Sequence, residues 1–195
     1  MTDEIFQVSS GIAVLLGALG WSFSEYWIHR ELGHNPKLIH NPFGREHVVH
    51  HSQGNAFAAT WKKLVVAVAI AGLLLAPAIL VAGARLGSAF VCGYIAFYLY
   101  YELLHRLEHV HRGIGPYGRW ARAHHFWHHF HNPRANHGVT SSLWDHVFGT
   151  CEKPGCVMVP ERLAMAWLVN PHTGDVWDDL QGRFALRRLD KRRAA

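Results

Sequence analysis

Ten of the 17 histidines in this chain recur at spacings that suit metal ligands. In chain order they are His29, His34, His47, His50, His51, His105, His109, His125, His128 and His129. Positions i, i+3 and i+4 of an α-helix share one face, so the two H-x2-HH motifs and the H-x3-H pair can each direct their imidazoles to a common point. His29 and His34 are five residues apart and need a distorted or ending helix, which Gly33 favours.

Ten imidazoles exceed what one metal ion can bind. A zinc site takes about four ligands, and a mononuclear non-haem iron site commonly combines two histidines with a carboxylate. Two ions with about five nitrogens each would account for the number, while imidazole suits iron, zinc, copper and nickel alike. The three cysteines lack the C-x2-C spacing of a zinc or redox site, so metal chemistry would depend on nitrogen ligands. Six histidines outside the motifs are interpreted as ordinary core or surface residues: His40, His111, His131, His137, His146 and His172.

Three apolar runs must position these histidines. Residues 64–84 carry no charged side chain over 21 positions, and as a helix they would span about 31 Å, enough to cross a bilayer. Residues 8–27 and 86–104 are two further candidate spans, and both carry aromatic residues typical of a membrane interface. The expected fold class is therefore all-α: an integral membrane protein of about three to four transmembrane helices with a histidine-rich helical cap. The alternative is that these runs are buried helices of a soluble bundle.

The basic residues predict an orientation. With three spans, residues 28–63 and the region beyond residue 105 lie on one side of the membrane and hold 18 of the 19 Lys and Arg residues. Arg85, between the second and third runs, is the remaining one. The positive-inside rule makes the basic side cytoplasmic. We therefore expect a multi-pass protein whose histidine motifs and C-terminus face the cytoplasm.

The chain beyond residue 150 has a different character. Residues 151–195 contain several prolines and glycines, show no chemical motif and include the basic stretch RRLDKRR near their end. They are expected to form a basic cytoplasmic tail that contacts anionic lipid headgroups. A pI near 9.3 could also suggest nucleic-acid binding, but the topology accounts for the basic residues and no recognition motif is present, so no nucleic-acid partner is expected.

The histidine motifs, the apolar hairpin between the second and third of them, and the stretch AHHFWHHFHNPRANHGVTSSLWDHVFGT at residues 123–150 resemble the fatty acid hydroxylase and sterol desaturase superfamily of membrane di-iron oxygenases. The resemblance covers about residues 21–150, and the motif series is most similar to that of the fatty acid 2-hydroxylases. It implies that residues 1–150 form a membrane di-iron hydroxylase domain. It also implies that the ten spaced histidines are the ligands and catalytic residues of a centre with two iron ions, which zinc can occupy in purified protein.

The activity implied by this resemblance is O₂-dependent hydroxylation of a C–H bond in a membrane lipid, with fatty acyl or sphingolipid chains as substrates. A sterol or carotenoid hydroxylase or desaturase on the same scaffold is an alternative. The eukaryotic fatty acid 2-hydroxylases often carry a fused cytochrome b5 domain. This sequence has neither the length nor the haem-ligand motif for one, so a separate electron donor of ferredoxin or cytochrome b5 type is expected. The alternative from another class is a non-catalytic membrane metal-binding or transport protein. A transporter would place ionisable ligands inside its spans, where this sequence has few.

Hydrogen-bond acceptors around the ligands should orient the imidazole N–H groups of such a centre. Candidates near the motifs are Glu25, Glu102, Glu108, Asn132, Asn136 and Asp145. Each could instead be a surface or helix-capping residue.

Overall fold

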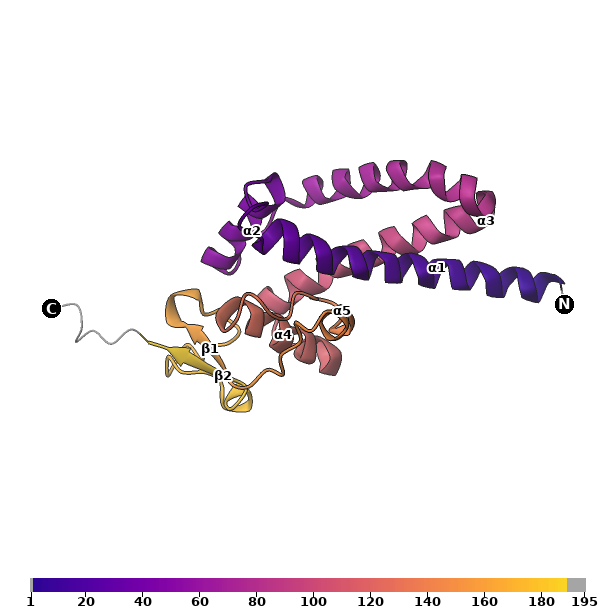
Figure 1. The fold of residues 1–195 in the computed structure, drawn as a ribbon. Helices are drawn as coiled ribbons and strands as arrows, with labels where there is room; N and C mark the ends of the chain where they lie inside the picture. Colours follow the sequence, from indigo (N-terminus) through magenta and orange to yellow (C-terminus); the bar gives the residue numbers. More distant parts are fainter. Residues whose placement is uncertain (1, 189–195) are drawn as a thin grey trace. The chain divides into compact units, whose positions relative to one another are not determined.

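The computed structural model describes residues 2–188, with side chains from residue 7 onward, and it divides into two compact units (Figure 1). The first unit consists of Met1–Trp27 and Ala58–Leu103, and the second of Ile28–Phe57 and Leu104–Ala195. The fold is mainly helical, as the sequence predicts. Within residues 2–188, two short β-strands are also present, and both belong to the second unit.

Two long helices build the first unit. Helix α1 covers Thr2–Trp27, and helix α3 covers Thr60–Val110. Gly83 interrupts α3 with φ 78° and ψ 162°, a backbone conformation that is essentially restricted to glycine. Figure 1 shows that α3 folds back on itself as a hairpin. The sequence predicts this hairpin with its loop at Arg85; the break lies two residues earlier because Gly83 accepts the required conformation.

Helix α1 and the second half of α3 approach each other closely. A Cβ atom added at Gly17 would clash with the backbone of Phe90, and one added at Gly93 would clash with the backbone of Val14. Small residues permit such close contact between membrane helices, whose association depends on van der Waals packing. The first unit therefore combines apolar length with a specific helix contact.

Two helices of the described chain are long and apolar enough to cross a membrane, namely Gln7–Gly33 and Thr60–Val110. Large apolar side chains on the hairpin face outward: Leu73, Leu80 and Val81 are 75%, 86% and 88% exposed. A soluble bundle would remove such side chains from water, so their exposure favours a lipid environment. The number of spans and the side on which the histidines lie stay predictions.

Short helices, loops and two strands build the second unit, which also includes the end of α3. Its elements are the π-helix η1 Ile28–Gly33, the helices α2 Pro42–Gln53, α4 Gly115–Phe130 and α5 Leu143–Val147, the strands β1 Val157–Pro160 and β2 Phe184–Arg187, and the 3-10 helices η2 Glu161–Leu163 and η3 Asp178–Leu180. Helix α2 begins at a side-chain cap, because Asn41 Oδ1 accepts a hydrogen bond of 2.9 Å from the N–H of Gly44. This cap fixes the start of a helix that carries three of the spaced histidines.

Residues 151–188 pack against α4. Strands β1 and β2 pair in parallel, with Val157 opposite Phe184. A buried apolar cluster joins the strands to α4 and consists of Phe126, Val157, Val159, Met165, Trp167, Leu168, Val176, Leu180 and Phe184. This segment is therefore a folded part of the second unit.

The structure thus differs from the tail that the sequence predicts over residues 151–195. Val157 and Val159 are fully buried, whereas Met158 between them is 41% exposed, which is the alternation of a strand with one buried face. A strand of four residues is too short for this pattern to stand out in a segment rich in proline and glycine. Residues 189–195 lie outside the described residues, so the contact of the basic end with lipid headgroups stays a prediction.

Candidate metal centre

All ten spaced histidines lie in the second unit, where their ring nitrogens gather in two groups. The first group consists of His29, His34, His47, His51 and His128. The second group consists of His50, His105, His109, His125 and His129. Within each group, one nitrogen from every ring lies within 4.8 Å of one from every other ring. The structure therefore brings together the histidines that the spacing singles out and divides them five and five.

Helices α2 and α4 each contribute to both groups. In α2, His47 and His51 belong to the first group, whereas His50 belongs to the second. In α4, His128 belongs to the first group and its two motif partners belong to the second. Adjacent residues on a helix point about 100° apart, so neighbouring histidines diverge while those four apart share a face. The sequence predicts a common point for each H-x2-HH motif; the structure instead divides each motif between the two groups.

The H-x4-H motif lies on the π-helix η1, which continues α1. The i→i+5 pattern of a π-helix brings residues five apart onto one face, and the ring centroids of His29 and His34 are 5.2 Å apart. A Cβ atom at Gly33 would lie 2.9 Å from Cδ2 of His47, so this position must be small for His47 to join the group. The sequence predicts a helix end or distortion at Gly33, and the structure contains the distortion.

The ring nitrogens are spaced like neighbouring ligands of one ion. In the first group, Nε2 of His34 lies 2.8 Å from Nε2 of His47 and 2.9 Å from Nε2 of His128. In the second group, the Nε2 atoms of His50 and His105 are 3.0 Å apart. Two nitrogens at right angles on an ion, each at about 2.1 Å, are about 3.0 Å apart. Both groups therefore fit a metal ion.

In at least one ring of each group, a hydrogen bond at the outer nitrogen determines which nitrogen faces the group. In the first group, Nδ1 of His128 lies 2.7 Å from the backbone carbonyl of Ala135. In the second group, Nδ1 of His50 lies 2.9 Å from that of Ala56. A carbonyl only accepts, so Nδ1 must carry the proton in both rings. Each Nε2 then presents its lone pair to the group, which is the form that binds a metal.

Several other ring nitrogens are buried with no hydrogen-bond partner among the described residues. Within the two groups they are Nε2 of His29, Nε2 of His51, Nδ1 of His109, Nδ1 of His125 and both ring nitrogens of His129. A buried polar atom without a partner costs free energy and is uncommon in folded proteins unless a ligand satisfies it. An ion that accepts imidazole lone pairs would satisfy atoms in both groups.

Burial keeps these imidazoles neutral. It lowers the pKa of His34 to about 4, and repulsion from His137 adds to the shift. Burial, followed by repulsion from neighbouring histidines, also lowers the pKa of His47, His125 and His128 well below its usual value. Neutral imidazole is the metal-binding form, so the two groups are ready to bind metal at neutral pH.

Asp145 holds the loop that leads to the first group. Its buried carboxylate accepts hydrogen bonds from the N–H of His137 at 2.8 Å, the N–H of Gly138 at 2.9 Å and the hydroxyl of Thr150 at 2.7 Å. Burial by itself would raise the pKa of Asp145, but its hydrogen bonds lower it overall. The carbonyl of His137 accepts from Nδ1 of His29 at 2.5 Å. Asp145 therefore acts on His29 through the backbone of His137.

The two asparagines among the candidate acceptors order the loop after α4. Asn136 has φ 56°, accepts a hydrogen bond of 2.7 Å from the N–H of Glu152, and donates to its carbonyl at 3.0 Å. Asn132 donates to the carboxylate of Glu152 at 2.6 Å. These contacts give both residues a structural role, and neither is seen to bond a ring nitrogen of the two groups.

The three glutamates occupy different places. Glu25 and Glu102 belong to the first unit, where Glu102 forms an ion pair with Lys63. Glu108 is fully buried in the second unit. Burial lowers the pKa of Arg122 to about 10, and the charge of Glu108 opposes that shift. An orienting role for these glutamates stays a prediction.

Two histidines that the sequence does not assign to the centre lie close to it. The ring of His137 is 5.3 Å from that of His128, and its carbonyl bonds His29. Nε2 of His124 lies 3.2 Å from the carboxylate of Asp145. The sequence interpretation treats His137 as an ordinary residue and gives His124 no role. Their position within the histidine-dense stretch of residues 123–150 is the signal that could have found them.

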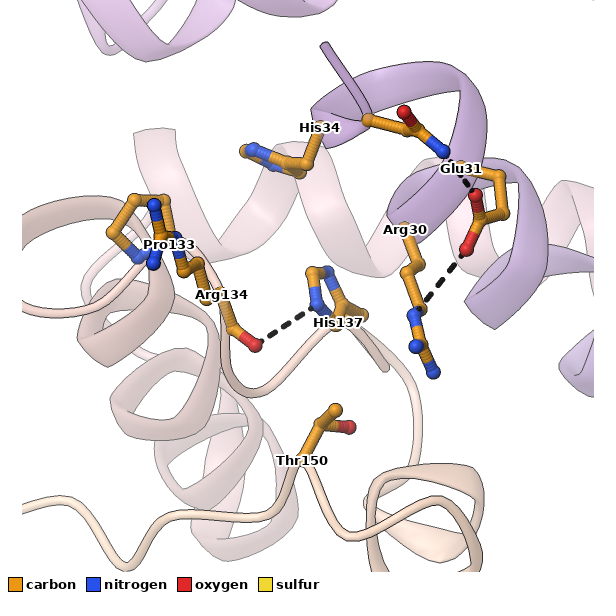
Figure 2. A pocket seen from close by; sticks show the side chains of 8 residues that line it. Arg30, Glu31, His34, Pro133, Arg134, His137 and Thr150 are labelled. Atoms are coloured by element: carbon orange, nitrogen blue, oxygen red, sulfur yellow. Dashed lines mark hydrogen bonds and ion pairs between the residues drawn. The ribbon is translucent and has the colours of Figure 1, made fainter. Parts of the chain in front are cut away.

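An open cavity of about 270 Å³ adjoins the first group (Figure 2). It is lined by Arg30, Glu31, His34, Asn35, Pro133, Arg134, His137 and Thr150. Figure 2 shows the ion pair between Arg30 and Glu31 on one side and the hydrogen bond between the ring of His137 and the carbonyl of Arg134 on the other. The cavity therefore gives water and small polar solutes access to His34.

The sequence is similar to proteins of known family. The fatty acid hydroxylase family model matches residues 14–150. The dihydroceramide fatty acyl 2-hydroxylase of Arabidopsis thaliana is 29% identical over 144 residues, which are 72% of this chain and 60% of that protein. The fatty acid 2-hydroxylase of Mus musculus is 31% identical over 144 residues, which are 70% of this chain and 38% of that protein. The chain thus spans from about two fifths to three fifths of the length of these two relatives.

A solved structure is similar in fold. It is described as full-length Scs7p with only the hydroxylase domain visible, and it superposes with a TM-score of 0.61 at 24% sequence identity. The match covers 76% of this chain and 58% of that chain. Because the family model matches most of the sequence, including all ten spaced histidines, this chain belongs to the fatty acid hydroxylase family.

Proposed function

We propose that this chain is an O₂-dependent oxidoreductase that hydroxylates a C–H bond in an acyl chain of a membrane lipid. The observation that carries the proposal is the division of ten buried or half-buried histidines into two groups of five. Membership of the fatty acid hydroxylase family supports it.

The two histidine groups would hold two iron ions. Bound there in the reduced state, such a pair can pass electrons to O₂ and supply an oxidant strong enough for an unactivated C–H bond. Zinc suits the same nitrogens but has no redox chemistry, so a zinc-filled centre would be inactive. The protein would contribute neutral ring nitrogens, backbone carbonyls that fix their tautomers, and the buried carboxylate of Asp145 that holds the surrounding loop.

The proposed substrate is a fatty acyl group, free or attached to a sphingolipid. The plant relative is named for dihydroceramide fatty acyl groups and the mouse relative for fatty acids, and both are named 2-hydroxylases. The exposed apolar side chains of the first unit would let an acyl chain approach through the lipid phase. A sterol or carotenoid substrate, or a desaturated product, is the alternative that product analysis would reveal.

We also propose a multi-pass topology with spans near residues 8–27, 64–84 and 86–104 and with both histidine groups at the cytoplasmic surface. The concentration of 18 of the 19 Lys and Arg residues in the segments around the histidines supports this orientation. A ferredoxin or a cytochrome b5-type protein would supply electrons from that side.

The test combines metal analysis with product analysis. The protein is expressed with iron-57, purified in detergent, and studied by elemental analysis and Mössbauer spectroscopy before and after exposure of the reduced form to O₂. Lipids of expressing cells grown under ¹⁸O₂ are then analysed by mass spectrometry. The expected result is about two irons per chain, one for each histidine group, and a hydroxylated acyl chain that carries the label.

His34→Ala removes a nitrogen of the first group and should abolish the labelled product. His172→Ala removes an exposed histidine outside both groups and should not change it. A protein that holds only zinc after anaerobic iron reconstitution, and yields no labelled lipid, would support a non-catalytic metal-binding protein instead.

A further inference from the structure

The end of helix α3 is held by a buried arginine from helix α4. Nε of Arg122 donates to the carbonyl of Glu108 at 2.7 Å. The two terminal nitrogens of the same guanidinium donate to three more backbone carbonyls, those of Leu107 at 3.3 Å, Arg112 at 3.4 Å and His111. The last carbonyls of a helix lack the partners that a further turn would provide, and this guanidinium bonds carbonyls in the last turn of α3 and just after it. Arg122 itself is 2% exposed.

A tryptophan from the C-terminal segment completes this arrangement. Nε1 of Trp167 donates to the carbonyl of His109 at 2.7 Å. The guanidinium carbon of Arg122 lies 3.8 Å from the centroid of the Trp167 ring, a favourable contact between a cation and an aromatic face. Phe126 of α4 packs on the same ring at 6.1 Å. Trp167 thus connects α3 to α4 directly and through Arg122.

The hydrogen bond of Trp167 reaches the backbone of a member of the second histidine group, His109. Helix α3 supplies His105 and His109 to that group, and α4 supplies His125 and His129. The loop held by Asp145 instead supports His29 of the first group. Helix α4 also carries His128 of the first group, so the contact that separates the two groups is the hydrogen bond of Trp167 to His109 at the end of α3.

We propose that Trp167 and Arg122 are positioning residues for the second histidine group, so that the C-terminal segment helps to set the metal affinity of that group. The proposal rests on the proposed function, because it takes the second group to be a metal site. It gives residues beyond the family match at 14–150 a part in the metal centre. Trp167 acts through the backbone of a ligand rather than by touching a metal.

The test uses the conservative variant Trp167→Phe in the full chain in detergent. Phenylalanine keeps an aromatic ring against Arg122 and Phe126 but cannot donate to the carbonyl of His109. The matched control is Trp177→Phe, which makes the same change in the same segment at a ring that faces the guanidinium of Arg112 and packs against the apolar cluster of the C-terminal segment. Circular dichroism and thermal melting verify that each variant is folded.

Metal affinity is measured by titration with Co²⁺, whose absorption reports ligand number, in two backgrounds. In His34→Ala, which damages the first group, Trp167→Phe should weaken the remaining cobalt site about 10-fold, the lower end of the range for residues that orient ligands. In His50→Ala, which damages the second group, Trp167→Phe should change cobalt affinity by less than about twofold. Trp177→Phe should have no effect in either background.

An unchanged affinity in the His34→Ala background, or equal weakening in both backgrounds, would overturn the proposal. Where Trp167→Phe does not fold, Arg122→Lys replaces it, with the exposed Arg119→Lys of the same helix as control, and the same selective weakening is expected. If wild-type protein binds two cobalt ions, and Trp167→Phe binds cobalt as tightly as its control Trp177→Phe, only this inference is overturned. Wild-type protein that binds no metal in the second group contradicts the proposed function and this inference with it.

Discussion

His51 and His129 stack face to face, with ring centroids 3.9 Å apart and ring planes 4° from parallel. His51 belongs to the first histidine group and His129 to the second, so the two groups meet at this pair. The ten histidines therefore form one centre with two halves rather than two distant sites.

This pair leads to a prediction about each half. His51→Ala removes a nitrogen from the first group and His129→Ala removes one from the second, so each variant should lose mainly the ion of its own half. Because the proposed reaction needs both ions, each variant should reduce hydroxylation by more than about 100-fold. Elemental analysis and product formation measure the two effects. His131→Ala, outside both groups, is the control. Full activity in either variant with one ion per chain would contradict the prediction.

Asp145→Asn should weaken the first group. The amide cannot provide the charged acceptor that the N–H groups of His137 and Gly138 share, so the loop that bonds His29 should loosen. We expect a loss of about 10- to 100-fold in metal affinity and of about 1–3 kcal/mol in the free energy of unfolding.

Metal titration and thermal melting of the detergent-purified protein measure these two quantities for Asp145→Asn. Asp178→Asn, at an exposed position in the C-terminal segment, is the matched control and should leave both unchanged. Equal metal affinities of the two variants would show that the carboxylate of Asp145 does not support the centre.

Metal-free protein should lose stability as the pH falls from about 6.5 to about 4. A histidine in the unfolded chain binds a proton near pH 6.5, whereas burial lowers the pKa of His34 in the folded protein to about 4. The unfolded state therefore binds more protons between these values. The contribution of His34 to stability is therefore complete at pH values above its pKa in the unfolded chain. It is lost as the pH falls toward its pKa in the folded protein.

Thermal melting of chelator-treated protein across this pH range tests the prediction. His34→Asn should decrease the pH dependence, and His172→Asn, at an exposed position, should not. A melting temperature that is independent of pH in the metal-free wild type would contradict the pKa shift.

Gly93→Ala should destabilise the first unit. The added Cβ atom would clash with the backbone of Val14, so α1 and α3 would have to separate. The expected cost is about 1–3 kcal/mol, as for overpacking elsewhere. Gly72→Ala is the matched control, because the same change in the same helix meets nothing within 4 Å. Equal melting temperatures of the two variants would show that the close helix contact does not stabilise the unit.

The sequence predicts much of the site because histidine spacing on helices has few geometric outcomes. It selects all ten members of the two groups, and it places a distortion at Gly33 because His29 and His34 cannot share a face of a regular helix. It does not predict which ring joins which group. His50 and His51 are adjacent, and their separation into different groups depends on where α4 and the end of α3 lie.

Other features depend on contacts between distant segments. Trp167 lies 58 positions from the His109 carbonyl that it bonds, and nothing in the local sequence indicates that pairing. Strand β1 is equally difficult to predict, because it consists of four residues and pairs with a strand that begins at Phe184. The hairpin in α3 is predictable from two apolar runs, whereas its exact break at Gly83 follows from a backbone angle.

The composition of the first group also constrains how the protein is made. His29 and His128 belong to the same group but are 99 positions apart, with both halves of α3 between them. A ribosome must therefore synthesise and release the whole apolar hairpin before either group has its full set of rings. Membrane insertion would then precede metal loading, and the nascent chain would expose its early histidines until α4 emerges.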